Sequence, residues 1–183
     1  MPTTTVHTTT ADDTVGFWRE AGPARWLAKD NAFDAEFRHR FENAHHAAAR
    51  RELDGWADTA TGSLALLILL DQFPRNSYRG SAHMYATDGL ARHFARRALD
   101  AGHDAEVEAA LRSFCYLPFM HSEDPADQDL SLRLQLQLEP NDFAVHHRDI
   151  IRRFGRFPHR NHLLGRDSTA EEAAFLAGGG FSG

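Results

Sequence analysis

A run of apolar residues that ends abruptly in charged and polar ones constrains the fold of this chain more than any other feature. The run is Leu64-Ala65-Leu66-Leu67-Ile68-Leu69-Leu70. A helix that is apolar all round has to be buried on every side, and we expect this one to begin near Thr61 or Ser63. It is far shorter than the ~20 residues needed to span a bilayer. It therefore predicts a helix in the middle of a globular core.

The residues that follow this run nearly recur later in the chain. Asp71-Gln72-Phe73-Pro74-Arg75-Asn76 resembles Arg156-Phe157-Pro158-His159-Arg160-Asn161, and each stretch comes after a helix-like apolar segment. Proline lacks a backbone donor and disfavours helical torsions in the residue before it, so one interpretation is a pair of helix stops. The other is that two arginine-bearing corners converge on one anionic ligand, because arginine pairs well with carboxylate and phosphate.

The rest of the chain also shows helical periodicity. Phe33, Phe37 and Phe41 lie on one helical face, and we expect further helices over residues 88–101, 104–117, 143–154 and 168–176. The leucines of residues 130–138 alternate as in a strand, but their neighbours are Gln and Arg, which favour a helix. The prediction is an all-α protein of about seven or eight helices, stacked as antiparallel pairs. It forms one domain over residues 15–177, with a disordered tail at 1–14 and a flexible tail at 178–183.

Composition narrows the range of partners. The formal net charge is −6 and Lys29 is the only lysine, so nucleic acid is not an expected partner. The single cysteine, Cys115, lies in an apolar stretch, which excludes an intramolecular disulfide and indicates a buried, inert thiol. The Thr-rich first ten residues have neither a basic nor an apolar region typical of a signal peptide. We expect a cytoplasmic protein without a membrane segment.

Polar residues gather at three corners of the expected fold, and these supply the candidate chemistry. His121 titrates near neutral pH, and Glu123 or Asp124 could orient its ring. The alternative is that Ser122 or Asp124 only caps a helix beginning at Pro125. The candidate catalytic residues are Asp71, His121 and His159. The candidate ligand-binding residues are Arg75, Asn76, Arg79, Glu123, Asp124, Arg156, Arg160 and Asn161.

No metal or cofactor is expected. A His, Glu and Asp set could be assembled from the same corners, but its spacing matches no metal motif such as His-Glu-x-x-His. There is also no glycine-rich, phosphate-binding loop, because the run Gly178–Gly180 follows a helical segment instead of preceding one.

These corners carry a family resemblance. The segments are Leu69–Asn76 with Arg79-Gly80, then Tyr116-Leu117-Pro118 with His121–Asp124 and Gln128, and then His147-Arg148-Asp149 leading into Gly155–Asn161. They resemble the bacterial domain-of-unknown-function family numbered 924 from about Phe17 to Leu176. The resemblance implies an all-α, tetratricopeptide-like fold and no particular reaction. Arg19 and Leu27 stand where the family usually has aromatic residues, which concerns packing near the N-terminus.

Three hypotheses for the polar corners remain open. In the first, the helices enclose a polar pocket that binds, and can transform, a small anionic molecule. In the second, the chain is a helical interaction module that presents a groove to a partner. In the third, the polar corners pair with one another as a structural network. The sequence leaves open whether the protein is a homo-oligomer.

Overall fold

The computed structural model describes residues 9–181, and every regular element in that part of the chain is helical. The longer helices are α1 (Ala11–Ala21), α3 (Asn31–Ala49), α4 (Ala60–Leu67), α6 (Asp88–Asp100), α9 (Pro125–Gln135), α10 (Asp142–Phe154) and α11 (Ala170–Ala177). The short α-helices are α2 (Pro23–Trp26), α5 (Phe73–Ser77), α7 (His103–Glu106) and α8 (Leu117–Met120). The remaining turns are η1 (Asp54–Asp58), η2 (Ile68–Gln72), η3 (Ala82–Tyr85), η4 (Arg112–Cys115) and η5 (Pro158–Arg160).

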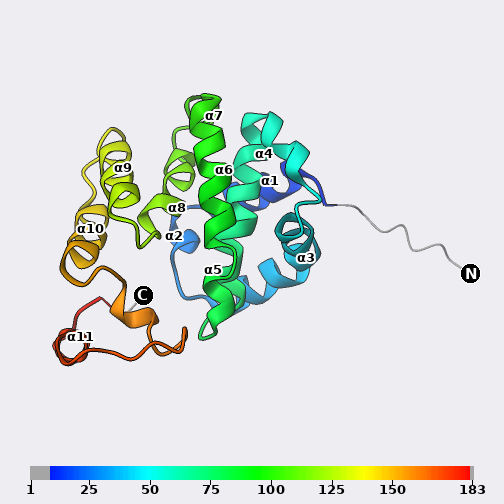
Figure 1. The fold of residues 1–183 in the computed structure, drawn as a ribbon. Coiled ribbons are helices and arrows are strands. Elements are labelled where there is room, and N and C mark those ends of the chain that lie inside the picture. The colour runs from blue at the N-terminus through cyan, green and yellow to red at the C-terminus, as the bar shows by residue number, and fades with distance from the viewer. Residues whose placement is uncertain (1–8, 182–183) are drawn as a thin grey trace, which may run out of the picture.

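Helix α4 lies at the centre of this arrangement. It packs against α1, α6, η1 and η4, and α3 packs against the continuation of α4 through η2 and α5. Helices α9 and α10 pack on each other and lie on one side of α6, while α1 and α3 lie on the other side (Figure 1). The all-α prediction is confirmed, with more helices in the described residues than the seven or eight expected. The tetratricopeptide-like arrangement stays a prediction.

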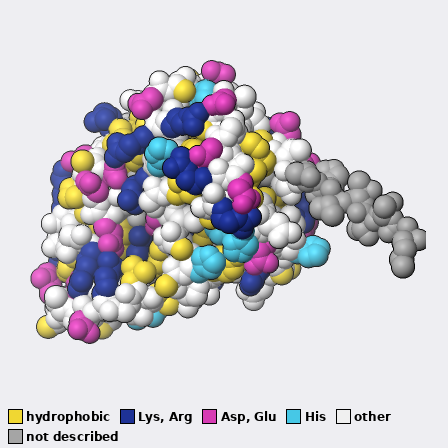
Figure 2. All heavy atoms as spheres, turned by 45° about the vertical axis from the view of Figure 1, so that its right-hand side comes forward, with side chains coloured by type: hydrophobic (Ala, Val, Ile, Leu, Met, Phe, Trp, Pro, Cys, Tyr) yellow, Lys and Arg dark blue, Asp and Glu magenta, His cyan; other side chains and the backbone are white. Residues whose placement is uncertain are grey.

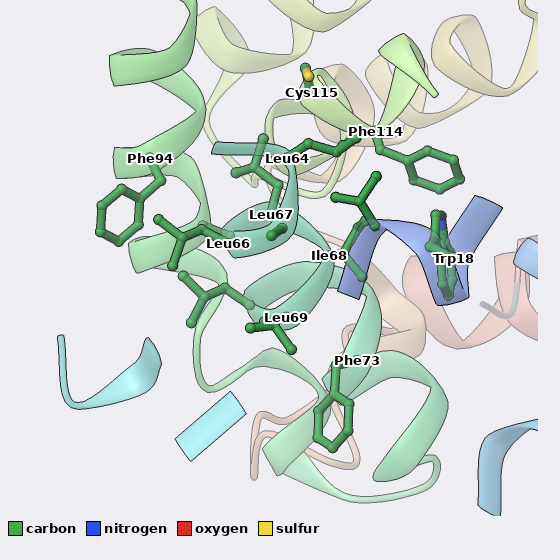
Figure 3. Packing of buried hydrophobic residues seen from close by; sticks show 14 of the residues in the cluster. Trp18, Leu64, Leu66, Leu67, Ile68, Leu69, Phe73, Phe94, Phe114 and Cys115 are labelled. Atoms are coloured by element: carbon green, nitrogen blue, oxygen red, sulfur yellow. The ribbon is translucent and has the colours of Figure 1, made fainter. Parts of the chain in front are cut away.

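The apolar run is buried on all sides, as its composition predicts. Leu64, Leu66 and Leu67 are at most 2% exposed. Figure 3 shows side chains that extend in several directions from α4 and η2. Leu66 points towards Phe94, and Ile68 lies on the same side of the helix as Trp18. Each leucine buried in this way contributes about 1.5–3 kcal/mol of hydrophobic stabilisation.

The predicted phenylalanine face of α3 is also confirmed. Phe33, Phe37 and Phe41 are buried, and all three rings pack around the ring of Phe17 from α1, at centroid distances of 5.3, 5.3 and 5.1 Å. Phe37 also meets Phe73 edge-on at 5.1 Å. This aromatic cluster joins α1 and α3 to the end of the central helix and so holds the first polar corner in place.

The first corner is not the helix stop that its proline suggested. The chain remains helical through Phe73, with φ −53° and ψ −49°, because η2 is a π-helical turn that absorbs Pro74. Pro74 cannot donate to the carbonyl of Leu70, and the hydroxyl of Thr87 donates to it instead at 2.5 Å. His45 Nδ1–H donates to the neighbouring carbonyl of Leu69 at 2.8 Å. Side chains from two other elements therefore satisfy the backbone that the π-turn exposes, as is typical of π-bulges at functional sites.

The second corner does stop its helix, as predicted. Gly155 ends α10 in the left-handed conformation, with φ 70°. Phe157 is extended, with φ −89° and ψ 108°, before Pro158 opens η5. Similar sequences thus form two different structures. In the first, Thr87 and His45 bond to the carbonyls that the π-turn exposes, whereas in the second the helix ends at Gly155 before the proline.

One predicted helix is wrong. Residues 104–117 form α7, η4 and the start of α8 in place of a single helix. Asp104, the first residue of the expected helix, accepts a hydrogen bond from the Tyr116 hydroxyl at 2.8 Å. The backbone leaves the helical region at Val107, and Arg112 donates to the carbonyls of Ala105 and Val107. These side-chain bonds within the segment stand in place of the intrahelical bonds that the apolar pattern predicted.

The ends of the domain differ in detail from the prediction. Residues 11–14, which were expected within the N-terminal tail, belong to α1 behind a Thr10–Asp13 capping box. Residues 1–8 and 182–183 lie outside the described part. At the other end, a capping box of Thr169 and Glu172 opens α11, which lies at the helix expected over residues 168–176. No helix in residues 9–181 is both long enough and apolar enough to cross a membrane.

Candidate functional site

The two arginine-bearing corners meet at Asp88, the first residue of α6. Arg75 Nη1 and Nη2 donate to the two carboxylate oxygens of Asp88 at 2.8 and 3.0 Å. Arg160 Nη1 lies 3.6 Å from Asp88 Oδ2. Tyr85, three residues before Asp88, has its ring 5.8 Å from the Arg75 guanidinium carbon and 4.6 Å from that of Arg160. We call Asp71, Arg75, Tyr85, Asp88, His121 and Arg160 the polar cluster.

Asp71 links the first corner to His121. Its carboxylate lies 3.1 Å from Arg75 Nη1, 2.8 Å from His121 Nδ1 and 2.6 Å from the donating amide of Gln72. Burial raises the pKa of Asp71, but Arg75 and His121 outweigh it and hold the pKa below its ordinary value. Since an ionised carboxylate can only accept, His121 must carry its proton on Nδ1 and present an unprotonated Nε2. No described residue donates a hydrogen bond to that Nε2.

Arg160 is the poorly paired member of the polar cluster. It is 6% exposed, its Nε is buried without a partner, and its guanidinium donates no hydrogen bond to any described residue. Its neighbours are instead the rings of Phe157 and Tyr85, 4.4 and 4.6 Å from its guanidinium carbon. Burial, followed by the charge of Arg75, lowers the pKa of Arg160 to about 10. It is therefore a cation at neutral pH, held by cation–π contacts and one long ion pair.

Two further histidines lie beside Arg160. His147 Nδ1–H donates to the carbonyl of Phe143 at 2.7 Å, so its Nε2 is unprotonated as well. The Nδ1 of His159 is buried without a partner. Burial lowers the pKa of His147 to about 4 and that of His159 to about 3. The ring of Phe181 covers both, with centroid distances of 4.6 and 5.1 Å.

The other predicted ligand-binding residues pair away from Arg160. Asn76 and Arg79 donate to Asp34 of α3 at 2.8 and 2.6 Å. Arg156 binds Glu172 with two hydrogen bonds of 2.6 and 2.8 Å, and Asn161 donates to Glu172 and Ser168. Hydrogen bonds from Arg156, then from the backbone of Thr169, lower the pKa of Glu172 to about 2 despite its burial.

Glu123 and Asp124, which follow α8, form structural contacts. Glu123 accepts two hydrogen bonds from Arg166, at 2.7 and 3.0 Å, and one from the backbone N–H of Phe157 at 2.8 Å. It thereby ties α8 to the second corner and does not orient His121. Asp124 is exposed and caps α9 by accepting from the backbone of Ala126 at 2.8 Å, which is the alternative that the sequence left open.

Sequence reasoning missed the residues that join the corners. Tyr85, Asp88 and Asp34 belong to elements that the sequence presents as ordinary turns and helix ends. Asp88 opens α6 as a favourable first-turn carboxylate, and nothing along the chain distinguishes it from such a residue. The one feature of the sequence that could have indicated these carboxylates is the number of arginines. The two corners contain three arginines, which need buried carboxylates as partners, and Asp71 alone could not pair with all of them.

Figure 2 shows one face of the molecule, on which acidic, basic and histidine side chains are interleaved without a broad basic field. A hollow of about 430 Å³ lies along α10 and is lined by Asp142, Phe143, Val145, His146 and Asp149. Within residues 9–181, no group of three or more His, Cys, Asp or Glu side chains is arranged to hold a metal ion. Burial raises the pKa of Cys115 to about 12, in keeping with an inert thiol.

Comparisons with known proteins agree with the fold. A family model described as "Bacterial protein of unknown function (DUF924)" matches residues 14–180. A solved structure of a protein of unknown function from Agrobacterium tumefaciens is 56% identical, with a TM-score of 0.88 over 91% of this chain and 96% of that one. None of the curated proteins matches the chain.

Proposed function

The chain belongs to the DUF924 family of bacterial proteins, and from the polar cluster that this fold builds we propose that it binds a small anionic molecule at Arg160. The observation that supports this is the buried guanidinium of Arg160, which donates no hydrogen bond to any described residue. Leaving a buried cation so poorly paired carries an effective penalty of several kcal/mol. An anion beside Arg160 would supply the hydrogen-bond acceptor that its guanidinium lacks.

The contrast with the neighbouring arginine strengthens the proposal. Arg75 is also nearly buried, yet its guanidinium donates to both oxygens of Asp88 and to the carbonyl of Asp71. Arg75 therefore needs no ligand, whereas Arg160 has its donors free. Arginine presents a planar fork of donors that fits a carboxylate or a phosphate with two parallel hydrogen bonds.

The Asp71–His121 pair gives such a site the means to move a proton. Asp71 fixes the tautomer of His121, which leaves an unprotonated Nε2 that can accept a proton. The carboxylate would also stabilise the imidazolium that forms when the ring takes up a proton, as the aspartate does in a Ser-His-Asp triad. The residues for which we propose these roles are Arg160 for binding and His121, oriented by Asp71, for acid–base chemistry.

The ligand we propose is small. His121 and Arg75 have side chains that are 16% and 14% exposed, so the polar cluster is reached only at its edge. The hollow along α10 does not include any member of the polar cluster. A carboxylic acid of a few carbons, or an inorganic oxyanion, suits this limited exposure better than a nucleotide.

A second candidate function has an observation of its own. Arg75, Arg79 and Arg156 all form close ion pairs with carboxylates, which favours a structural network that locks helix ends together. In that case Arg160 would contribute through Tyr85 and Phe157 alone. The two candidates differ in whether added anions stabilise the protein.

Thermal unfolding in the presence of anions tests the proposal. The panel contains formate, acetate, glycolate, inorganic phosphate and a nucleotide, with wild type, Arg160→Gln and Arg152→Gln as the proteins. Arg152 is a suitable control because it is an exposed arginine of α10, paired with Asp129 at the surface. A ligand at 100 times its Kd stabilises the folded state by ~2.7 kcal/mol. We expect a rise in Tm for wild type and Arg152→Gln that is lost in Arg160→Gln. Equal responses of all three proteins, or no response, would contradict an anion site at Arg160.

A further inference from the structure

The charges of the polar cluster already balance without a ligand. Its cations are Arg75 and Arg160, and its anions are Asp71 and Asp88, whose carboxylates contact those arginines. Nearby, Glu123 and Arg166 form a neutral pair of their own. Burial raises the pKa of Tyr85, which keeps its hydroxyl neutral. An anion that binds here alone would therefore leave a buried net negative charge, which is costly in a region of low dielectric.

The free ring nitrogen of His121 can remove that cost. Its Nδ1–H is committed to Asp71 at 2.8 Å, and its Nε2 has no partner among residues 9–181. Burial and the charge of Arg75 lower the pKa of His121, so the ring is neutral before a ligand arrives. A new negative charge beside it would favour the imidazolium, whose second N–H the ligand could accept.

We propose that the site takes its anion together with one proton, which His121 Nε2 accepts, so that the ligand is bound in effect as a weak acid. This inference rests on the proposed function and specifies its ligand chemistry. The ligand class is a monocarboxylic acid or the monoanion of phosphoric acid, since each brings a single charge for one proton to balance. A dianion would leave a net charge even after His121 is protonated.

His121 suits this role better than its neighbours because of the groups that act on it. Asp71 from η2 stabilises its charged form through a hydrogen bond, Asp88 from α6 favours that form as well, and Arg75 from α5 opposes it. His147 from α10 is a neutral neighbour whose Nδ1 binds only a backbone carbonyl. The other titratable groups around the site are Tyr85, Glu123, His159, Arg160 and Arg166. Only His121 combines a free Nε2 with a carboxylate on the opposite nitrogen.

Titration calorimetry in buffers of different ionisation enthalpy measures the proton directly. The probe is acetate, with Tris and PIPES as the buffers at pH 7, and the proteins are wild type, His121→Asn and His147→Asn. We expect wild type and His147→Asn to take up about one proton for each acetate bound. We expect His121→Asn, which can still donate to Asp71, to bind acetate more weakly and to take up none. Linkage then requires the wild-type Kd to rise up to tenfold for each pH unit above 7.

The outcomes separate this inference from the proposal beneath it. Acetate binding without proton uptake in wild type would overturn the inference and leave the anion site intact. If proton uptake is lost in His147→Asn and retained in His121→Asn, His121 is not the residue that accepts the proton. The absence of any heat or thermal shift, for acetate and for inorganic phosphate alike, would instead overturn the proposed function itself.

Discussion

Arg75 and Arg160 share the carboxylate of Asp88, but they share it unequally. Arg75 donates to both oxygens, at 2.8 and 3.0 Å, whereas the nearest nitrogen of Arg160 stays 3.6 Å away. The two residues come from the two similar sequence stretches, so the fold brings the corners together as one hypothesis required. It also assigns them different tasks, since one arginine completes an ion-pair network and the other keeps its donors free.

This inequality predicts different costs for removing the two arginines. Arg75→Gln should destabilise the protein by about 3–5 kcal/mol, because it leaves Asp71 and Asp88 buried without their cation. Arg160→Gln should cost clearly less than Arg75→Gln, because Asp88 keeps both of its hydrogen bonds from Arg75. Urea unfolding of both variants measures the difference. Similar losses in the two variants would indicate that Arg160 is structural and would count against a ligand.

The π-turn predicts a coupling between Thr87 and Pro74. Thr87→Val should destabilise the protein by about 1–3 kcal/mol, because the buried carbonyl of Leu70 then has no donor. In a Pro74→Ala background the same change should cost less, since the introduced alanine supplies a backbone N–H. Unfolding free energies of the two single variants and the double variant give this coupling energy. Additive effects would mean that Thr87 contributes by packing. Ser81→Ala, which removes an exposed bond to the carbonyl of Tyr78, is the control.

The N-terminal turn of the central helix predicts strong intolerance of a side chain at Gly62. A Cβ there would lie 1.9 Å from the backbone oxygen of Trp56, which cannot move without shifting η1. Gly62→Ala should therefore lower the unfolding free energy by more than about 3 kcal/mol. Gly89→Ala is the matched control: that site in α6 is open, and alanine should be neutral or stabilise by up to about 1 kcal/mol. A mild effect at Gly62 would show that η1 adjusts easily.

Buried neutral histidines predict that stability falls in mild acid. Burial lowers the pKa of both His45 and His147 to about 4, from the ordinary value of 6.5. The unfolded chain therefore binds more protons below pH 6.5, so stability is complete above that pH and declines as pH falls towards 4. Each of the two contributes up to about 1.4 kcal/mol per pH unit in this range. Asp71, whose pKa is held below 3.8, adds a further loss below about pH 4.

Urea midpoints between pH 8 and pH 4 measure this decline. We expect His147→Gln to flatten the curve between pH 6.5 and pH 4, while a change of the exposed His93 to Gln leaves it unaltered. A wild-type midpoint that stays constant down to pH 5 would show that these rings are not buried as neutral groups. Because Phe181 covers His147, Phe181→Ala should make the decline smaller, since water admitted to the ring brings its pKa closer to the ordinary value.

The elements that the sequence predicted well are those in which local pattern and burial agree. The spacing of Phe33, Phe37 and Phe41 placed α3, and the helix expected over residues 168–176 corresponds to α11. The prediction over residues 104–117 failed because apolar spacing continues through a segment that bends back on itself, where Tyr116 bonds to Asp104 and Arg112 to the carbonyl of Val107. Apolar periodicity indicates which side chains are buried, but it does not indicate which groups form hydrogen bonds with the backbone.

The amino-acid sequence by itself determined the all-helical class, the buried central helix and the two corners where charge gathers, because helix periodicity and the cost of exposing leucine act over short segments. Only the tertiary structure decided that Asn76 and Arg79 bind Asp34 and that Arg75 binds Asp88. It also decided that Arg160 comes no closer to Asp88 than 3.6 Å. The reason is that a buried ion pair depends on distances between elements far apart in the chain. Two nearly identical stretches could therefore form a π-turn in one place and a helix stop in the other.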